Sequence, residues 1–242
     1  MPSRLGTQNR AARPFPSACP LFFERCFPVI VESLVIGPFE VNTYVLYLDG
    51  GHDAVVIDPG DAPREILELL SRHRLNVTHV INTHGHGDHI AGNAALKAAF
   101  PGAKICVHPR DAHMLSDANA NLSAAFGFSV TSPEADLRIE GNTELAAAGI
   151  AFRVEHVPGH SPGSVCLVPL DAGTLVFSGD TLFAGSIGRT DLPGGNTGLL
   201  LAGIRDKILS LPDETVVYPG HGVKTTVGVE KRENPFVGAG GL

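Results

Sequence analysis

Short apolar runs alternate with amphipathic stretches from about residue 31 onward, a pattern typical of an α/β domain. Runs rich in Val, Ile and Leu that are bounded by turn-forming residues predict strands, which in the first half cover 41–48, 54–58, 77–82 and 104–107. Apolar residues at helical spacing predict helices over 63–70, 90–100 and 111–115. Asp61 is the expected cap of the first of these helices, and Pro63 suits its first turn.

The second half of the chain repeats this alternation. Residues 116–133 are small and polar and predict a loop, after which a β-rich stretch covers 136–177. A last helix is predicted over 197–209 and a last strand over 215–218. Two β-rich halves, each with its own helices, predict two packed sheets that helices cover on the outside.

Length and composition fit one domain of ordinary size. The chain has 242 residues, of which 43% are hydrophobic, so we expect a substantial core within a domain over 29–237. Residues 1–28 hold four arginines, one acid and five prolines, and we expect them to form a disordered extension. Their acid-poor composition leaves an organelle transit peptide as an alternative. Residues 238–242 are expected to form a loose tail.

Charge and cysteine usage narrow the range of partners. The formal net charge of −7 argues against nucleic acid, because phosphate binding needs clustered Lys and Arg. No apolar run approaches the roughly 18 residues that a membrane helix needs, so we expect no membrane partner. The four cysteines form no C-x-x-C pair, and Cys106 and Cys166 lie in apolar runs where we expect buried thiols. A reducing cytoplasm is the expected location.

The most concentrated chemistry lies in the segment Thr-His-Gly-His-Gly-Asp-His at 83–89, directly after a predicted strand. Neutral imidazole and carboxylate are ligands that divalent metals accept. Three later segments also place a histidine or an aspartate after a glycine, where a strand gives way to a loop. The candidate metal ligands are His84, His86, Asp88, His89, His160, Asp180 and His221. Seven ligands exceed the needs of one tetrahedral ion, so the sequence predicts two ions.

The spacing suggests how two ions would share these residues. His84 and His86, two positions apart on a loop, can hold one ion together with His160. Asp88 and His89 begin the next helix and can reach a second ion with His221, while Asp180 can bridge the two through its two oxygens. Asp58 ends a strand on the same edge, and it is expected either to orient a ligand imidazole or to form a turn before Pro59.

These segments resemble the metallo-β-lactamase-fold hydrolases and, among them, the short single-domain branch of glyoxalase II (hydroxyacylglutathione hydrolase). The resemblance covers about residues 31–224 and rests on the segments at 83–89, 158–164, 177–191 and 218–222. It implies a single-domain, four-layer αββα sandwich and the same division of ligands, with Asp88 and Asp180 at the catalytic centre.

The resemblance also implies an activity. We expect hydrolysis of a small-molecule thioester such as S-lactoylglutathione through a metal-bridging hydroxide, with zinc as the expected metal and iron or manganese as alternatives. Arg189 matches a glutathione contact of the family, although an ion pair with Asp191 that stiffens the loop is an equal alternative. In two-domain glyoxalase II a helical domain follows the last histidine ligand; only residues 222–242 follow His221, so we expect it to be absent.

Two other activities use the same scaffold. A persulfide dioxygenase would keep many of these ligands around one Fe(II), but its family usually differs around residues 182–187. A phosphodiesterase acting on RNA shares the first motif, but the acidic charge and the missing nucleic-acid-binding insertion count against it. Thioester hydrolysis is therefore the favoured prediction, with the mononuclear iron enzyme as the alternative.

Overall fold

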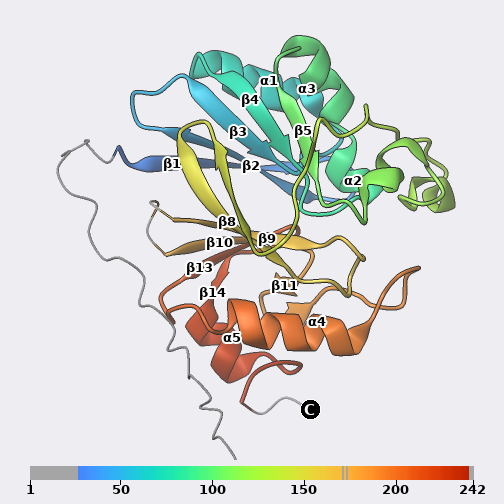
Figure 1. Cartoon of the computed structure of the whole chain (residues 1–242), viewed down its shortest axis with the longest axis vertical. Helices are drawn as coiled ribbons and strands as arrows, with labels where there is room; N and C mark the ends of the chain where they lie inside the picture. Colours follow the sequence, from blue (N-terminus) through green and yellow to red (C-terminus); the bar gives the residue numbers. More distant parts are fainter. Residues whose placement is uncertain (1–26, 171, 173, 240–242) are drawn as a thin grey trace, which may run out of the picture.

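Two six-stranded sheets lie face to face in the computed structural model, which describes residues 27–170, 172 and 174–239, with helices on both outer surfaces (Figure 1). In the first sheet the strands stand in chain order: β1 (Val29–Ile36), β2 (Val41–Leu48), β3 (Asp53–Ile57), β4 (Asn76–Ile81), β5 (Lys104–Val107) and β6 (Leu137–Arg138). The pairs β1–β2 and β2–β3 are antiparallel, whereas β3 to β6 run parallel. Parallel neighbours need crossover connections, which the helices α1 (Pro63–Arg72) and α3 (Asn93–Ala99) supply.

The second sheet contains the strands of the later half of the chain. Their order is β14 (Thr225–Thr226), β13 (Val216–Pro219), β10 (Leu175–Gly179), β9 (Val165–Pro169), β8 (Ile150–His156) and β7 (Thr143–Ala147). The pair β10–β13 is parallel and the other pairs are antiparallel. A small hairpin of β11 (Leu182–Phe183) and β12 (Ser186–Ile187) follows β10. The helices α4 (Thr197–Gly203) and α5 (Val227–Glu233) cover the outer face of this sheet (Figure 1).

Three separate apolar clusters explain the layering, because four layers enclose three interfaces. The cluster around Ile66 and Val80 lies between the first sheet and its helices. The cluster around Ile81 and Phe177 lies between the two sheets, and a third cluster around Leu200 joins the second sheet to α4. Neighbouring Val80 and Ile81 belong to different clusters because successive side chains of a strand point to opposite faces. The predicted αββα sandwich is confirmed.

The predicted strands of the first sheet are confirmed, with ends that shift by one residue at most. The edge strand β1 is not among the predicted strands, because Glu32 and Ser33 interrupt its apolar run and most of its side chains are only half-buried. In the second half, the predicted last strand over 215–218 is confirmed as β13, but β14 and α5 follow it and were not predicted.

The helix predicted over 90–100 is confirmed as α3 (Asn93–Ala99), but it begins later than predicted, because Ile90 belongs to the separate short helix α2 (Gly87–Ile90). The break lies at Gly92, whose backbone N–H donates to the carbonyl of Pro59 at 2.8 Å. A β-carbon on residue 92 would lie only 2.8 Å from Pro59 Cβ, so this close approach requires glycine. The helix predicted over 197–209 is confirmed, as α4 followed directly by a π-helical turn over Ile204–Ile208.

Three smaller expectations need correction. Asp61 does not cap α1, since Ala62 precedes Pro63 and no side chain accepts from the first turn. The helix predicted over 111–115 is a single 3₁₀ turn, η1, at Ala112–Ser116. Gly238 and Ala239 are not loose, because their N–H groups donate to carbonyls of Asn234 and Lys231.

The remaining expectations concern compartment and the chain ends. Cys106 and Cys166 are buried free thiols, as predicted, and burial raises the pKa of each to about 12.

Within the part of the chain that is described, no helix combines the length and apolar character needed to cross a membrane. The predicted disordered extension falls almost wholly on residues 1–26, and the end of the predicted tail falls on residues 240–242; both lie outside the described residues.

Candidate metal centre

All seven candidate ligands meet where strands give way to loops. His84 and His86 lie between β4 and α2, and Asp88 and His89 lie in α2. His160 lies between β8 and β9, Asp180 follows β10 and His221 follows β13. His84, His86, His89 and His160 are buried, whereas Asp88, Asp180 and His221 are partly accessible. The accessible residues therefore form the side of the site that a small molecule can approach.

The first group comprises His84, His86 and His160, which each offer a ring nitrogen within 4.8 Å of the other two. His160 Nδ1 donates to the carbonyl of Arg189 at 2.9 Å, which orients the ring so that its Nε2 lies 3.0 Å from His86 Nδ1. Burial, and then His160, lower the pKa of His86 to about 3 and keep that ring neutral. His84 Nε2 is buried without a hydrogen-bond partner. Converging lone pairs and an unpaired buried nitrogen fit a cation.

The second group comprises Asp88, His89 and His221, again within 4.8 Å. His221 Nδ1 donates to the carbonyl of Phe39 at 2.9 Å, which directs Nε2 inward, 3.2 Å from His89 Nε2 and 3.4 Å from Asp88 Oδ2. This backbone contact to a ring N–H fixes the orientation of the imidazole, as carbonyls commonly do behind metal-binding histidines.

Asp180 lies between the two groups. Its Oδ2 is 3.6 Å from both His160 Nε2 and His221 Nε2, and its Oδ1 is 3.5 Å from His89 Nε2. Oδ1 is buried and has no hydrogen-bond partner. Gly220 makes room for this arrangement, because a β-carbon there would overlap the Asp180 carboxylate. Asp180 thus lies within reach of histidines from both groups of candidate ligands.

The carboxylates give the site a strong preference for positive charge. Burial opposes protonation of His89, but Asp88, Asp180 and Asp58 outweigh it and raise the pKa of His89 to about 10. Burial also acts against ionisation of Asp88, yet His89 and His221 hold its pKa below the usual value. Without a metal ion, the proton on His89 offsets the negative charge of the carboxylates. A divalent ion bound to the same ring nitrogen would replace that proton.

Asp58 supports the site from behind. Its carboxylate accepts hydrogen bonds from Thr83 N at 2.7 Å and Thr83 Oγ1 at 2.6 Å, and its Oδ2 lies 3.1 Å from His89 Nδ1. The backbone of Asp58 has a φ of 50°, a left-handed conformation that few residues other than glycine adopt. These contacts favour the orienting role over the alternative of a turn before Pro59.

Asp111 is not among the site residues predicted from the sequence, although it joins two ligand-bearing loops. Its fully buried carboxylate accepts from Gly85 N at 3.0 Å, from Ser161 Oγ at 2.6 Å and from Gly163 N at 2.6 Å. One side chain thus joins the loop that carries His84 and His86 to the loop that carries His160. No signal in the sequence marks this residue, because its partners lie far from it along the chain and only the packing of the two sheets brings them together.

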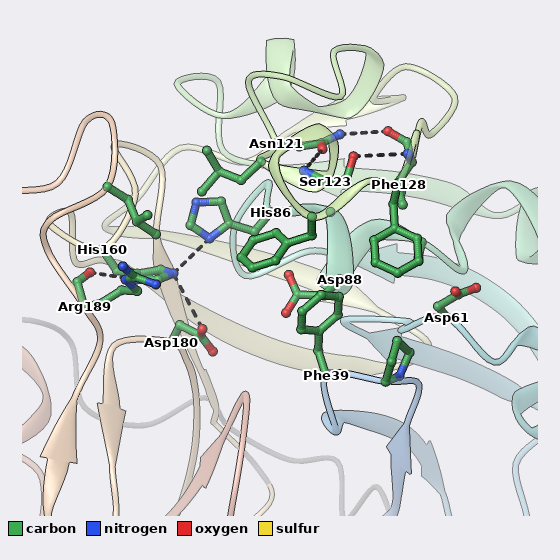
Figure 2. A pocket seen from close by; sticks show the side chains of 17 residues that line it. Phe39, Asp61, His86, Asp88, Asn121, Ser123, Phe128, His160, Asp180 and Arg189 are labelled. Atoms are coloured by element: carbon green, nitrogen blue, oxygen red, sulfur yellow. Dashed lines mark hydrogen bonds and ion pairs between the residues drawn. The ribbon is translucent and has the colours of Figure 1, made fainter.

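A cavity of about 150 Å³ opens beside the ligands (Figure 2). His86, Asp88, His160 and Asp180 line it, together with an apolar wall that includes Phe39, Phe126 and Phe128. Arg189 also lines the cavity, and its guanidinium forms a two-point ion pair with the Asp191 carboxylate, each contact 2.8 Å long. The predicted ion pair of Arg189 with Asp191 is therefore present, and Arg189 lies at the cavity, while its contact with a substrate stays a prediction.

Comparisons with known proteins agree with this geometry. Residues 36–221 match the metallo-beta-lactamase superfamily. Hydroxyacylglutathione hydrolase GloC from Haemophilus influenzae is 33% identical over 86% of this chain and 97% of its own length. The crystal structure of BLEG-1 B3 metallo-beta-lactamase is 40% identical, with a TM-score of 0.82 over 86% of this chain and 99% of its own. TTHA1623 in a di-iron-bound form is 39% identical, with a TM-score of 0.75 over 85% and 100%.

The family match spans most of the chain, from the end of β1 to His221, and includes every segment that supplies a candidate ligand. The layered fold and the cluster of histidines and aspartates agree with it. The chain belongs to the metallo-beta-lactamase superfamily.

Proposed function

We propose that this protein hydrolyses thioesters such as S-lactoylglutathione with the help of two divalent metal ions. The observation that carries the proposal is the second ligand group, Asp88, His89 and His221, which shares Asp180 with the first. A second group of donors beside a shared carboxylate supports two ions rather than one. The name of the relative GloC, a hydroxyacylglutathione hydrolase, supports the choice of substrate class.

The donor set suits borderline divalent metals, with zinc as the expected ion and iron or manganese as alternatives. The di-iron form of TTHA1623 supports a pair of ions and keeps iron among the candidates. Two such ions, when bound, would polarise a carbonyl as Lewis acids. They would also lower the pKa of a bound water molecule, so that hydroxide is available at neutral pH.

The protein's own side chains orient the metal-binding nitrogens, and no side-chain nucleophile is needed to attack the carbonyl carbon of the substrate. The carbonyls of Arg189 and Phe39 fix His160 and His221 in the tautomer that directs Nε2 inward. Ser161 is not available as a nucleophile, because it is fully buried, does not line the cavity and uses its hydroxyl in contacts with Asp111 and Ser164. A thiolate leaves without needing a proton, so no separate general acid is required for a thioester.

The test combines metal analysis with two assays. Metal-replete protein should hold about two ions per chain and release thiol from S-lactoylglutathione without consuming oxygen. One ion per chain, with oxygen uptake on glutathione persulfide and no thiol release from S-lactoylglutathione, would replace the hydrolase with the mononuclear iron alternative. Removal of the metal with a chelator should abolish thiol release, and a return of activity after adding zinc, iron or manganese separately would identify the productive ion.

A further inference from the structure

Three phenylalanine side chains form one exposed surface beside the candidate metal centre. Phe39, Phe126 and Phe128 are 38%, 58% and 44% exposed, although each is large and apolar. The Phe39 ring meets Phe126 at 5.3 Å and Phe128 at 6.1 Å between ring centres, with the ring planes at 74° and 73°. A cluster of this kind marks a binding surface, because isolated exposed side chains need no explanation but contiguous ones do.

This surface, which we call the phenylalanine wall, belongs to the same cavity as His86, Asp88 and Asp180 (Figure 2). Leu122 and Val130 extend it. The cavity volume of about 150 Å³ is close to that of an apolar protein cavity known to accommodate a benzene ring. The wall is therefore positioned to contact whatever group lies next to the reacting atoms.

The wall is also held rigidly against the metal ligands. The loop that carries Phe126 and Phe128 is closed by buried Asn121, which donates to the carbonyls of Met114 at 3.0 Å and Val130 at 2.9 Å. The carbonyl of Asn121 accepts from Gly87 N in α2 at 2.9 Å, one residue before Asp88. On the other side, the carbonyl of Phe39 accepts from His221. A preformed wall loses little entropy when a substrate binds.

Charge is distributed unevenly along the cavity. In Figure 2 Arg189, His160 and Asp180 lie at one end of the cavity, Asp88 and Phe39 lie near its middle, and Phe128 and Asp61 lie towards the other end. Among the described residues that line the cavity, Arg189 supplies the permanent positive charge, at the end away from the wall. A carboxylate-bearing leaving group such as glutathione can take the place of the Asp191 carboxylate at Arg189, which leaves the wall for the acyl side of the scissile bond.

We infer that the preferred substrates are thioesters whose acyl group carries an aryl, or comparably bulky apolar, substituent next to the carbonyl. This inference rests on the proposed thioester hydrolysis. An aryl ring against the wall gains both burial and edge-to-face contacts with rings already set at steep angles to one another. The methyl group of a lactoyl substrate covers much less of this surface.

A matched pair of substrates tests the inference directly. S-mandeloylglutathione and S-lactoylglutathione differ only by a phenyl in place of a methyl group, so the ratio of their kcat/KM values isolates contact with the wall. The wild-type protein should favour the mandeloyl thioester by about tenfold or more. The double variant Phe126→Ala/Phe128→Ala should bring this ratio towards one, because it loses more kcat/KM on the mandeloyl substrate than on the lactoyl substrate.

Controls separate the possible outcomes. Phe236→Ala removes a phenylalanine of similar exposure, 40%, that does not line the cavity, and it should preserve the ratio. If the double variant fails to fold, the single variant Phe126→Ala, at the most exposed ring, gives the same comparison. An equal or inverted ratio in the wild type, or a ratio that the wall variants leave unchanged, overturns the inference while thioester hydrolysis stands. Absence of hydrolysis of both substrates overturns the proposed function itself.

Discussion

Oδ2 of Asp58 lies 3.1 Å from Nδ1 of His89, on the side of the imidazole that faces away from the candidate metal centre. Asp58 directly follows β3, whereas His89 lies in α2, and the Asp58 backbone adopts a left-handed conformation that presents its carboxylate to this ring. Nε2 of His89 is thereby directed at Asp88, Asp180 and His221. The first prediction follows from this contact.

Asp58→Asn should weaken binding of the second ion by about 10- to 100-fold, because a neutral amide orients and polarises His89 less well than a carboxylate. Asparagine is the appropriate substitution since it tolerates a positive φ, so the backbone at residue 58 is preserved. Titration with a competing chromophoric chelator measures the affinity. An unchanged affinity for both ions would show that Asp58 serves only the fold of its loop.

His221→Ala should reduce the metal content from about two ions per chain to about one and lower kcat by orders of magnitude, because it removes a donor of the second group alone. Elemental analysis of protein equilibrated with excess metal measures the content. His113→Ala, at an exposed histidine outside all candidate ligand groups, is the control. Retention of two ions in His221→Ala would refute the division of ligands.

Asp111→Ala should destabilise the protein by on the order of 3 kcal/mol, because three donors, one from Ser161 and two from backbone groups, lose a buried acceptor. It should also weaken the first ion more than the second, since Asp111 joins the two loops that supply His84, His86 and His160. Thermal unfolding and metal titration together separate these effects. Asp111→Asn retains one acceptor oxygen and should lie between the wild type and Asp111→Ala in both measurements. Equal weakening of both ions would indicate a general loss of structure.

Arg189→Ala should raise KM for a glutathione thioester more than it lowers kcat, if the guanidinium holds a carboxylate equally in the ground and transition states. Asp191→Asn provides the complementary change, because it releases Arg189 from its present ion pair and should lower KM. Steady-state kinetics on both variants measures the two parameters. A joint fall of kcat and thermal stability in both variants would instead mean that the pair only stiffens the loop.

The stacked pair of His108 and His156, with ring centres 4.1 Å apart, should make the fold sensitive to acid. Burial, followed by His156 and Arg110, lowers the pKa of His108 to about 4. Between the ordinary histidine value of about 6.5 and this lowered pKa, the unfolded chain binds a proton that the folded chain does not, so stability falls as pH decreases through that window.

His108→Gln removes this proton uptake and should flatten the decline of stability between pH 6.5 and pH 4. The measurement is urea unfolding of chelator-treated protein over that range, so that metal loss does not contribute. His52→Gln, at an exposed position, is the matched control. A pH profile of His108→Gln that runs parallel to the wild-type profile would assign the acid sensitivity to other groups.

The local pattern of the sequence determined the order of the elements and the identity of the candidate ligands. Apolar runs predict most strands, because side chains that are buried on a strand recur as a regular pattern of apolar residues along the sequence. The segment at 83–89 reveals candidate ligands because their chemistry is rare and their spacing is short. Even the division of the ligands into two groups around Asp180 follows from the positions of the motifs along the chain, and the fold brings the same groups together.

The tertiary structure decided the contacts that depend on segments distant in sequence. The break at Gly92 arises from its approach to Pro59, and periodicity within the helix carries no trace of it. Nothing in the sequence around Asp111 distinguishes it from other aspartates, and its role depends on two loops that meet at its carboxylate. The phenylalanine wall forms because the turn before β2 and the loop after η1 meet beside α2. Contacts between residues that are distant in sequence leave no periodic pattern, because the partners of each side chain are set by the packing of the whole fold.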